Sequence, residues 1–461
     1  MVQPAREFVG TFRFALRRRL GTGGMGVVYE AHDRQTDRIV ALKTLTRAEA
    51  AHIYRFKREF RTLAGVAHPN LVTLYELMSE GNDWFFTMEL VNGVSFINYV
   101  RPEMTDANLG DTDHTLRVPR EISARSSNSE ADTEIFDSSR ISADELSLRA
   151  DFGLATTNLL LDENRLRAAL RQLAEGVNRL HELGKIHRDL KPSNVLVTDE
   201  GRVVILDFGL VEDINPELHE TLLAGTPDYM SPEQGAQTAI SKASDWYSVG
   251  VMLYQALTGR LPFRGKFFEV MLRKQTRDPI QPREINPNVP RDLNELCMRL
   301  LRRDPDARPS GREILHAVGA ERSISTSPVS DSSFIGRERQ IAELHDAFRA
   351  TREGRTVTVY LHGNSGMGKS TLAKIFVDQL KAQTRNVVVL QGRCYERESV
   401  PYKALDGVVD SLSKHLASLR RAKAEGLMPR NRAALARVFP VMLQVDAIFD
   451  ARSIKPETID P

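Results

Sequence analysis

The spacing of apolar and polar residues predicts the regular elements in the first part of the chain. On both sides of the glycine-rich stretch "LGTGGMG" (20–26), apolar and polar residues alternate, which predicts two strands joined by a glycine turn. Between 161 and 185, apolar residues recur with helical spacing and predict an amphipathic helix, for which Asp162 is a candidate N-cap. Its apolar stripe consists of Leu166, Leu170, Leu173, Val177 and Leu180.

Two polar stretches interrupt this patterning and divide the chain. Residues from about 101 to 158 are rich in Ser, Asp, Glu and Arg and have no sustained period, which predicts a mostly disordered insert. The stretch "ERSISTSPVSDSS" (321–333) predicts an interdomain linker. We therefore expect an N-terminal tail (1–10), a first domain (11–320) that carries the insert, the linker, and a second domain (334–461).

Composition narrows the class of protein. The apolar fraction of 41% and the charged fraction of 27% are typical of a globular protein, and the formal net charge of +2 gives no reason to expect a nucleic-acid partner. Two cysteines, Cys297 and Cys394, imply no disulfide framework. No signal peptide or membrane-spanning run is present, so a cytoplasmic protein is expected. Composition does not predict the oligomeric state.

The glycine turn is a candidate phosphate-binding loop. Gly21, Gly23 and Gly26 form the pattern G-x-G-x-x-G, whose backbone N–H groups can approach phosphate oxygens closely. Lys43 follows in the apolar strand "IVALK", and Glu59 comes sixteen residues later in a helical stretch. An ion pair between them would direct Lys43 toward ATP phosphates. Taken alone, an ordinary glycine-rich hairpin and solvated Lys and Glu residues remain open alternatives.

The most specific stretch is "IHRDLKPSNVLV" (186–197). Asp189 is placed to accept a hydroxyl proton, Lys191 to neutralise charge near the γ-phosphate, and Asn194 to hold a metal ion. Asp207 follows the apolar run "VVIL" and is the expected second metal ligand. His187 has apolar neighbours and is predicted to be a core histidine rather than a base. The ordered set predicts phosphoryl transfer.

With these motifs, residues 11 to about 320 resemble the eukaryotic-like Ser/Thr protein kinases of bacteria. The stretch "GTPDYMSPEQ" (225–234) is similar to the acceptor-binding loop of that family, with Ser231 in place of an alanine. The resemblance implies a bilobal α+β fold with a β-rich N-lobe and an α-rich C-lobe. It also implies that Asp245 anchors the catalytic loop and that Arg308 pairs with Glu233.

The resemblance further implies the cofactors and the acceptor. ATP and Mg²⁺ are expected, with Mn²⁺ as an alternative ion, and the partners would be protein substrates. Lys191 and Thr226 occupy positions that go with Ser or Thr acceptors. Besides the glycines, Lys43, Asn194 and Asp207, the expected nucleotide-binding residues are Leu20, Val28, Ala41, Met88, Glu89, Val91 and Leu196.

The tripeptide D-F-G occurs twice: one copy begins at Asp207, and the other begins at Asp151, at the end of the polar insert and ahead of Asp189. No strand leads into it, so it is interpreted as an accidental copy. The alternative is that Phe152 and Leu154 pack on the kinase as a regulatory plug. In the loop between Asp207 and Thr226, Thr221 is a candidate for autophosphorylation, because Arg188 beside Asp189 could pair with a phosphate. The alternative is that acidic residues of this loop partly substitute for a phosphate.

The second domain contains another phosphate-binding pattern. Gly363, Gly368, Lys369 and Ser370 fit G-x-x-x-x-G-K-[ST], after a predicted apolar strand and before a helix. Lys369 would reach the β- and γ-phosphates and Ser370 would hold Mg²⁺, while Gly366 adds an N–H to the loop. This part resembles the start of the AAA-type ATPase modules of large bacterial signalling proteins.

One element of such a module is missing from the pattern. No apolar strand leads into an Asp or Glu after the loop, and Asp378, the nearest candidate, falls within the predicted helix. An incomplete, truncated α/β P-loop NTPase domain is therefore expected. For the whole chain we expect a Ser/Thr protein kinase with autophosphorylation in bacterial signal transduction. The alternative is a nucleotide-switched signalling scaffold with little catalysis.

Overall fold

The computed structural model describes residues 8–23, 26–45, 49–81, 83–102, 161–208, 212–213, 226–319, 337–364, 367–384, 387–429 and 431–449. The chain divides into two compact units, one of residues 1–48 with 55–321 and one of 49–54 with 322–461. The expected insert lies almost wholly, and the linker wholly, outside the described residues. Their predicted character stays a prediction.

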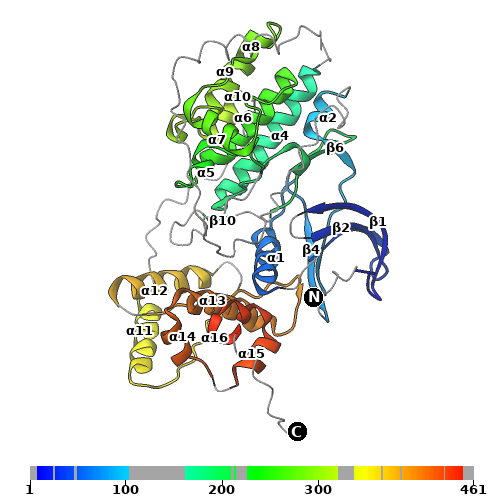
Figure 1. Ribbon diagram of the computed structural model, residues 1–461. Coiled ribbons are helices and arrows are strands. Elements are labelled where there is room, and N and C mark those ends of the chain that lie inside the picture. Colours follow the sequence, from blue (N-terminus) through cyan, green and yellow to red (C-terminus); the bar gives the residue numbers. More distant parts are fainter. Residues whose placement is uncertain are drawn as a thin grey trace, which may run out of the picture. The chain divides into compact units, whose positions relative to one another are not determined.

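The first unit begins with an antiparallel sheet (blue in Figure 1) in the order β1-β2-β3-β5-β4. In β2, buried and partly exposed residues largely alternate, as the sequence pattern indicated, and Phe14, Leu42 and Phe85 lie in the apolar core on one face of the sheet. The helix α1 contributes Phe56 and Phe60 to contacts with Phe86 of the sheet. The elements are β1 (Phe14–Gly23), β2 (Gly26–Asp33), β3 (Arg38–Leu45), α1 (Ala50–Leu63), β4 (Leu74–Glu80) and β5 (Asp83–Met88). Residues 50–54 of α1 fall in the second unit and the rest of the helix in the first.

The rest of the first unit is mainly helical. Its central helix, α6 (Lys242–Thr258), is buried from Ser244 to Leu257, which explains its nearly continuous apolar sequence. The other helices are α2 (Phe96–Val100), α4 (Glu163–Glu182), α5 (Pro232–Gly235), α7 (Phe267–Thr276), α8 (Pro282–Ile285), α9 (Arg291–Leu300) and α10 (Gly311–Ala317), with 3₁₀ turns η3 (Pro192–Asn194) and η5 (Pro305–Ala307). The sheet-rich first lobe and helical second lobe confirm the fold expected from the sequence.

The helix predicted from the stripe at 166–180 is α4, and all five stripe residues are buried. Asp162 is its N-cap, with a side-chain oxygen that accepts the N–H of Arg165. Short strands join α4 to the catalytic segments, with β6 beside β8, β8 beside β9, and β7 beside β10. Their bounds are β6 (Gly93–Ser95), β7 (Lys185–Ile186), β8 (Val195–Thr198), β9 (Val203–Ile205) and β10 (Glu212–Asp213).

Helices predominate in the described residues of the second unit, with one strand of two residues. Phe439, Val441, Met442, Val445 and Leu416 form the centre of its apolar core. Its elements are α11 (Glu338–Arg352), α12 (Lys369–Gln383), β11 (Glu398–Ser399), α13 (Lys403–Ser418), α14 (Arg421–Gly426), α15 (Arg432–Val438), η6 (Pro440–Gln444) and α16 (Asp446–Phe449). Among all the described residues, no helix has the length and apolar character needed to cross a membrane.

The apolar strand predicted before the second phosphate-binding pattern is not formed. Residues 355–364 carry no regular structure, and Val359 and Tyr360 are 49% and 76% exposed. A strand needs hydrogen bonds from a neighbouring strand, and the described residues of the second unit provide none beside this segment. The helix predicted after the pattern is present as α12.

Candidate active site

Lys43, Glu59 and Asp207 come from three different elements and meet in the first unit. Lys43 lies on β3 between Val28 of β2 and Phe86 of β5, so the sheet fixes its backbone on both sides. Its Nζ donates to Glu59 Oε1 on α1 at 2.6 Å and to Asp207 Oδ1 at 2.9 Å. The sequence motifs separated by up to 164 residues are therefore brought into direct contact.

The charges at this contact do not balance, because two carboxylates face one ammonium. Burial opposes the charge on Lys43, but Glu59 and Asp207 outweigh it and raise the pKa of the ammonium. Burial raises the pKa of Glu59 to about 7, helped by the negative charge of Asp207 and opposed by Lys43. Lys43 thus stays charged, while Glu59 can exchange a proton near neutral pH.

Asp189 lies at the centre of a second group of contacts. Its carboxylate accepts the backbone N–H of Thr226 at 3.2 Å and the Asn194 side-chain amide at 3.1 Å. Lys191 Nζ lies 3.0 Å from Asp189 Oδ2 and donates to Thr226 Oγ1 at 2.9 Å. The carboxylate of Asp189 is therefore oriented from three directions, and Lys191 bridges it to Thr226.

The backbone on both sides of the site is held in an uncommon conformation. Arg188 and Asp207 have φ values of 71° and 55°, a left-handed region that costs energy for residues other than glycine. Asp245, fully buried on α6, offsets this strain at the first position by accepting the N–H groups of His187 and Arg188. His181 on α4 contacts the same carboxylate at 2.8 Å. The expected anchoring contact of Asp245 is present.

His187 is a core residue, as its apolar neighbours predicted. Its ring is completely buried against Phe208, and Nε2 lies 3.0 Å from the carbonyl oxygen of Leu206. Nδ1 accepts the backbone N–H of Asp189 at 3.3 Å. The imidazole thus supports the loop around Asp189.

The glycine loop is formed by the ends of β1 and β2, where Gly23 lies opposite Gly26. A Cβ on Gly26 would come 1.7 Å from the carbonyl oxygen of Thr44, so only glycine fits there. Gly21 has no such neighbour, since a Cβ there would meet nothing within 4 Å. The neighbouring strand leaves no room for a side chain at Gly26, whereas at Gly21 the surrounding protein would accommodate one.

Four of the seven residues expected around the adenine lie on neighbouring strands of one sheet, and the other three lie outside that sheet. Ala41 on β3 lies opposite Met88 at the end of β5, and the N–H of Glu89 donates to Thr73. The side chain of Glu89 is bound by Arg202, an ion pair that sequence motifs did not predict. The other expected residues are Leu20 on β1, Val28 on β2, Leu196 on β8, and Val91 in the segment after β5.

The expected ion pair between Glu233 and Arg308 is present and buried. Both guanidinium end nitrogens of Arg308 donate to Glu233, at 2.7 and 2.8 Å. Ser231, the position where the family has alanine, caps α5 in a reciprocal pair with Gln234. The serine hydroxyl therefore contributes to the start of the helix without disturbing the pair.

In the second unit, the phosphate-binding pattern stands at the start of α12. Gly368 is the N-cap with φ 76°, a conformation that favours glycine. Lys369 Nζ donates to the carbonyl oxygens of Gly363 and Asn364, each at 2.8 Å, and Ser370 is exposed on the first turn. Gly366 lies outside the described residues. The lysine that would bind phosphate is thus held by its own loop.

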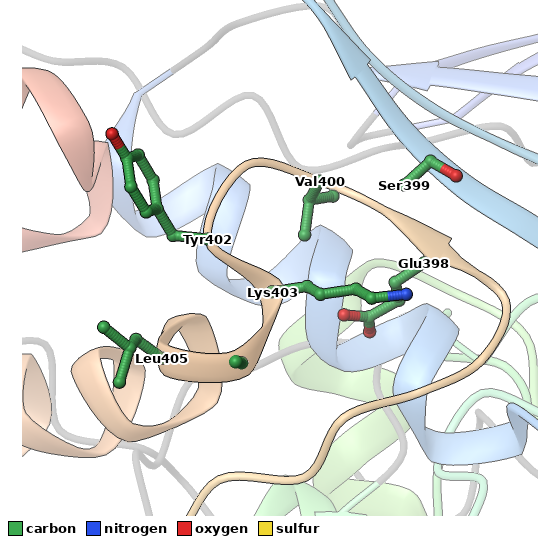
Figure 2. A pocket seen from close by; sticks show the side chains of 7 residues that line it. Glu398, Ser399, Val400, Tyr402, Lys403 and Leu405 are labelled. Carbon is green, nitrogen blue, oxygen red and sulfur yellow. The ribbon is translucent and has the colours of Figure 1, made fainter.

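A separate hollow in the second unit contains none of the predicted site residues (Figure 2). It is lined by Glu398, Ser399, Val400, Tyr402, Lys403, Ala404 and Leu405. The second D-F-G sequence, with Asp151, Phe152 and Leu154, lies outside the described residues, as does Thr221. Their predicted roles stay predictions.

Sequence motifs also did not predict Lys274, which is on α7 and only 1% exposed. It lies four positions after Val270, another buried residue, and therefore on the same face of the helix. This spacing is the sequence feature that could have indicated a buried lysine. The ammonium of Lys274 contacts the segment after Thr226, beside the Asp189 group.

Comparison with known families matches both units. The family described as protein kinase domain matches residues 14–115 and 143–318, and the family described as AAA ATPase domain matches residues 333–454. The first match covers more than half of the chain. It leaves out 116–142, within the stretch interpreted as an insert.

Several curated bacterial proteins are similar to the chain. Serine/threonine-protein kinase pkn2 of Myxococcus xanthus is 31% identical over 326 residues, or 68% of this chain and 32% of that protein. Serine/threonine-protein kinase PknA of Mycobacterium tuberculosis is 30% identical over 321 residues, or 67% and 61% of the two chains. Serine/threonine-protein kinase PrkC of Bacillus subtilis is 26% identical over 312 residues, which are 66% of this chain and 40% of that protein. The chain thus spans only part of the length of these relatives.

Proposed function

Because the chain belongs to the protein kinase family, we propose that its first unit transfers the γ-phosphoryl group of ATP to Ser and Thr residues of proteins, including itself. The observation that carries this proposal is the arrangement of Asp189, Lys191 and Thr226. A carboxylate held by the backbone N–H of Thr226 and bridged by Lys191 is suited to receive the proton of an acceptor hydroxyl.

The acceptor class follows from the same contacts. Lys191 Nζ binds the hydroxyl of Thr226, so a flexible cation is fixed next to Asp189. An aliphatic hydroxyl that approaches Asp189 would place its oxygen beside this ammonium, which stabilises the charge that develops during transfer. The names of the bacterial relatives, all serine/threonine-protein kinases, support this choice of acceptor.

Lys43 and Glu59 would position the phosphates of ATP. The ammonium of Lys43 now contacts Asp207, and bound ATP would replace that contact with phosphate oxygens while Glu59 keeps hold of the lysine. Glycines 21, 23 and 26 would present N–H groups from the turn between β1 and β2. The adenine would lie near Ala41 and Met88.

The side chains of Asn194 and Asp207 fit a divalent cation. The Asn194 amide nitrogen donates to Asp189, which leaves its oxygen as the metal-facing atom. Asp207 is about half exposed and provides a carboxylate, so the two give the oxygen ligands that Mg²⁺ prefers, with Mn²⁺ as an alternative. An ion held there would neutralise negative charge on the phosphates during transfer.

The test is Asp189→Asn, which keeps the shape of the side chain and removes its basicity. Loss of a positioned base costs about 10²- to 10⁴-fold in rate, or roughly 3 to 5 kcal/mol of barrier. Transfer from labelled ATP to a generic basic protein should fall by that factor, with ATP affinity and Tm nearly unchanged. Wild-type activity in this variant would refute the role of Asp189. A wild-type protein that binds ATP but transfers nothing would favour the scaffold alternative.

We also place the protein in the cytoplasm, where thiols stay reduced. Cys297 and Cys394 are both free thiols, and Cys394 is exposed. Fractionation of cells that produce the protein tests this placement.

A further inference from the structure

The segment from Pro227 to Met230 is held to the helical lobe through its carbonyl groups. It directly follows Thr226, the residue that contacts both Asp189 and Lys191. Lys274 Nζ donates to the carbonyl oxygens of Pro227, Asp228 and Met230 at 2.8, 2.7 and 2.7 Å. The remaining carbonyl, of Tyr229, accepts the hydroxyl of Ser248 on α6 at 2.8 Å. Four consecutive carbonyl groups are therefore bound by side chains.

The ammonium group of Lys274 is buried, which is unusual for a lysine. A buried lysine loses its hydration and needs compensating contacts. Here the three N–H donors of the ammonium have three carbonyl acceptors, and the ring of Tyr247 lies 5.4 Å from Nζ. The pKa of Lys274 is lowered to about 7, because burial outweighs the opposing effect of the negative charges on Asp228 and Glu233. The lysine is thus a specific connector rather than a solvated surface residue.

We propose that Lys274 is a positioning residue for the protein acceptor, because it fixes the backbone of 227–230 and through it the place of Thr226 beside Asp189. Side-chain packing supports the same geometry, since Met230 belongs to an apolar cluster with Val270 and Met271 of α7. Within the part of the chain that the structure describes, Lys274 contacts the carbonyl groups of Pro227, Asp228 and Met230 and the ring of Tyr247, and has no contact with Lys43 or Glu59. Its loss should therefore affect the acceptor far more than ATP.

This inference rests on the proposed kinase function, and it predicts that kcat/KM for the acceptor changes while the KM for ATP does not. Lys274→Met keeps the length of the side chain and removes all three donors. We expect kcat/KM for a basic protein acceptor to fall about 10- to 100-fold, the range in which small misplacements of reacting groups act. The KM for ATP should stay within about twofold of wild type.

Two further variants separate positioning from general damage. Arg273→Met removes an exposed cation from the adjacent position of α7. It should leave kcat/KM for the acceptor and the KM for ATP unchanged. Lys274→Arg keeps a charge and several donors, and should recover part of the acceptor activity lost in Lys274→Met. If Lys274→Met left acceptor kinetics at the wild-type level, or weakened ATP and acceptor binding equally, the positioning role would be refuted.

Hydrogen exchange provides a test that does not depend on phosphotransfer. The amides of Thr226 and of 228–230 should exchange about tenfold faster in Lys274→Met, whereas those of β3 and α4 should exchange as in the wild type. A wild-type protein without kinase activity would contradict the proposed function, yet this local loss of protection would still support the role of Lys274. Unchanged exchange at Thr226 and 228–230 would overturn that role even in an active kinase.

Discussion

At the residue scale, the ammonium of Lys43 balances only one of the two carboxylates that contact it. Asp207 is half exposed to water, while Glu59 is buried beside the same lysine. Burial therefore raises the pKa of Glu59 to about 7. Ionised Glu59 binds Lys43 as an ion pair, and protonation weakens this pair.

This titration predicts an acid limb in the activity profile. Below pH 7 Glu59 gains a proton, so Lys43 is held less well for phosphate binding. If ionised Glu59 is required, about a tenth of the protein is competent at pH 6, and kcat/KM for ATP should fall about tenfold between pH 8 and pH 6. Steady-state kinetics at saturating acceptor would measure it.

The control is Glu59→Gln, which should show a low and flatter profile, because the titrating group is gone. ATP also titrates in this range, but it does so equally for both proteins, and the difference between the profiles isolates Glu59. An identical acid limb in the variant would assign the titration elsewhere.

The contacts around Asp189 could be predicted from a motif because the spacing of its residues follows from fixed local geometry. Asp189, Lys191 and Asn194 lie within six positions of one another, so one loop brings them together. Lys274 and Arg202 act through contacts with segments distant in sequence, and no local pattern encodes such partners. They became visible only when the folded chain showed which carbonyls and carboxylates they bind.

At the element scale, the same reason explains which helices and strands could be predicted. The stripe of α4 needs only one apolar neighbour surface, and its prediction was confirmed. Residues 357–361 have a comparable apolar pattern, yet a strand also needs hydrogen-bond partners from elsewhere in the chain. The described residues supply none, so the pattern alone was misleading there.

A prediction at this scale concerns the segment between α2 and α4. The N–H of Asp162 donates to the carbonyl oxygen of Val100 at 3.1 Å, so the two ends of this segment meet. Replacing residues 103–160 with about four Gly and Ser residues should keep the fold, since a short flexible linker spans such a gap. We expect kcat within about twofold of wild type, measured by transfer to a basic protein.

The same replacement removes the D-F-G sequence at 151 and so tests whether that copy has a function. Asp207→Ala, which removes a metal ligand while leaving the segment intact, should abolish transfer. Loss of activity in the replacement protein with an unchanged Tm would show that the segment contributes to catalysis. A large gain in activity would instead support a regulatory plug.

At the scale of the whole molecule, the chain carries two phosphate-binding patterns with different support from their surroundings. In the first unit, the glycine turn is completed by a lysine, two carboxylates and an amide from separate elements. In the second unit, Lys369 contacts only backbone oxygens of its own loop among its hydrogen bonds in the described residues. Asp378 lies exposed within α12 rather than at the end of a strand.

This contrast predicts that the second unit binds nucleotide poorly and hydrolyses almost none. Bound phosphate would have to draw Lys369 from the carbonyl oxygens of Gly363 and Asn364. Hydrolysis also needs an acidic group that holds the metal, and no apolar strand leads into one within the described part of this unit. ATP hydrolysis should be measured in the Asp189→Asn background, with and without Lys369→Ala. The two proteins should give the same low rate, whereas a clear rate that depends on Lys369 would show that an acidic group acts there after all.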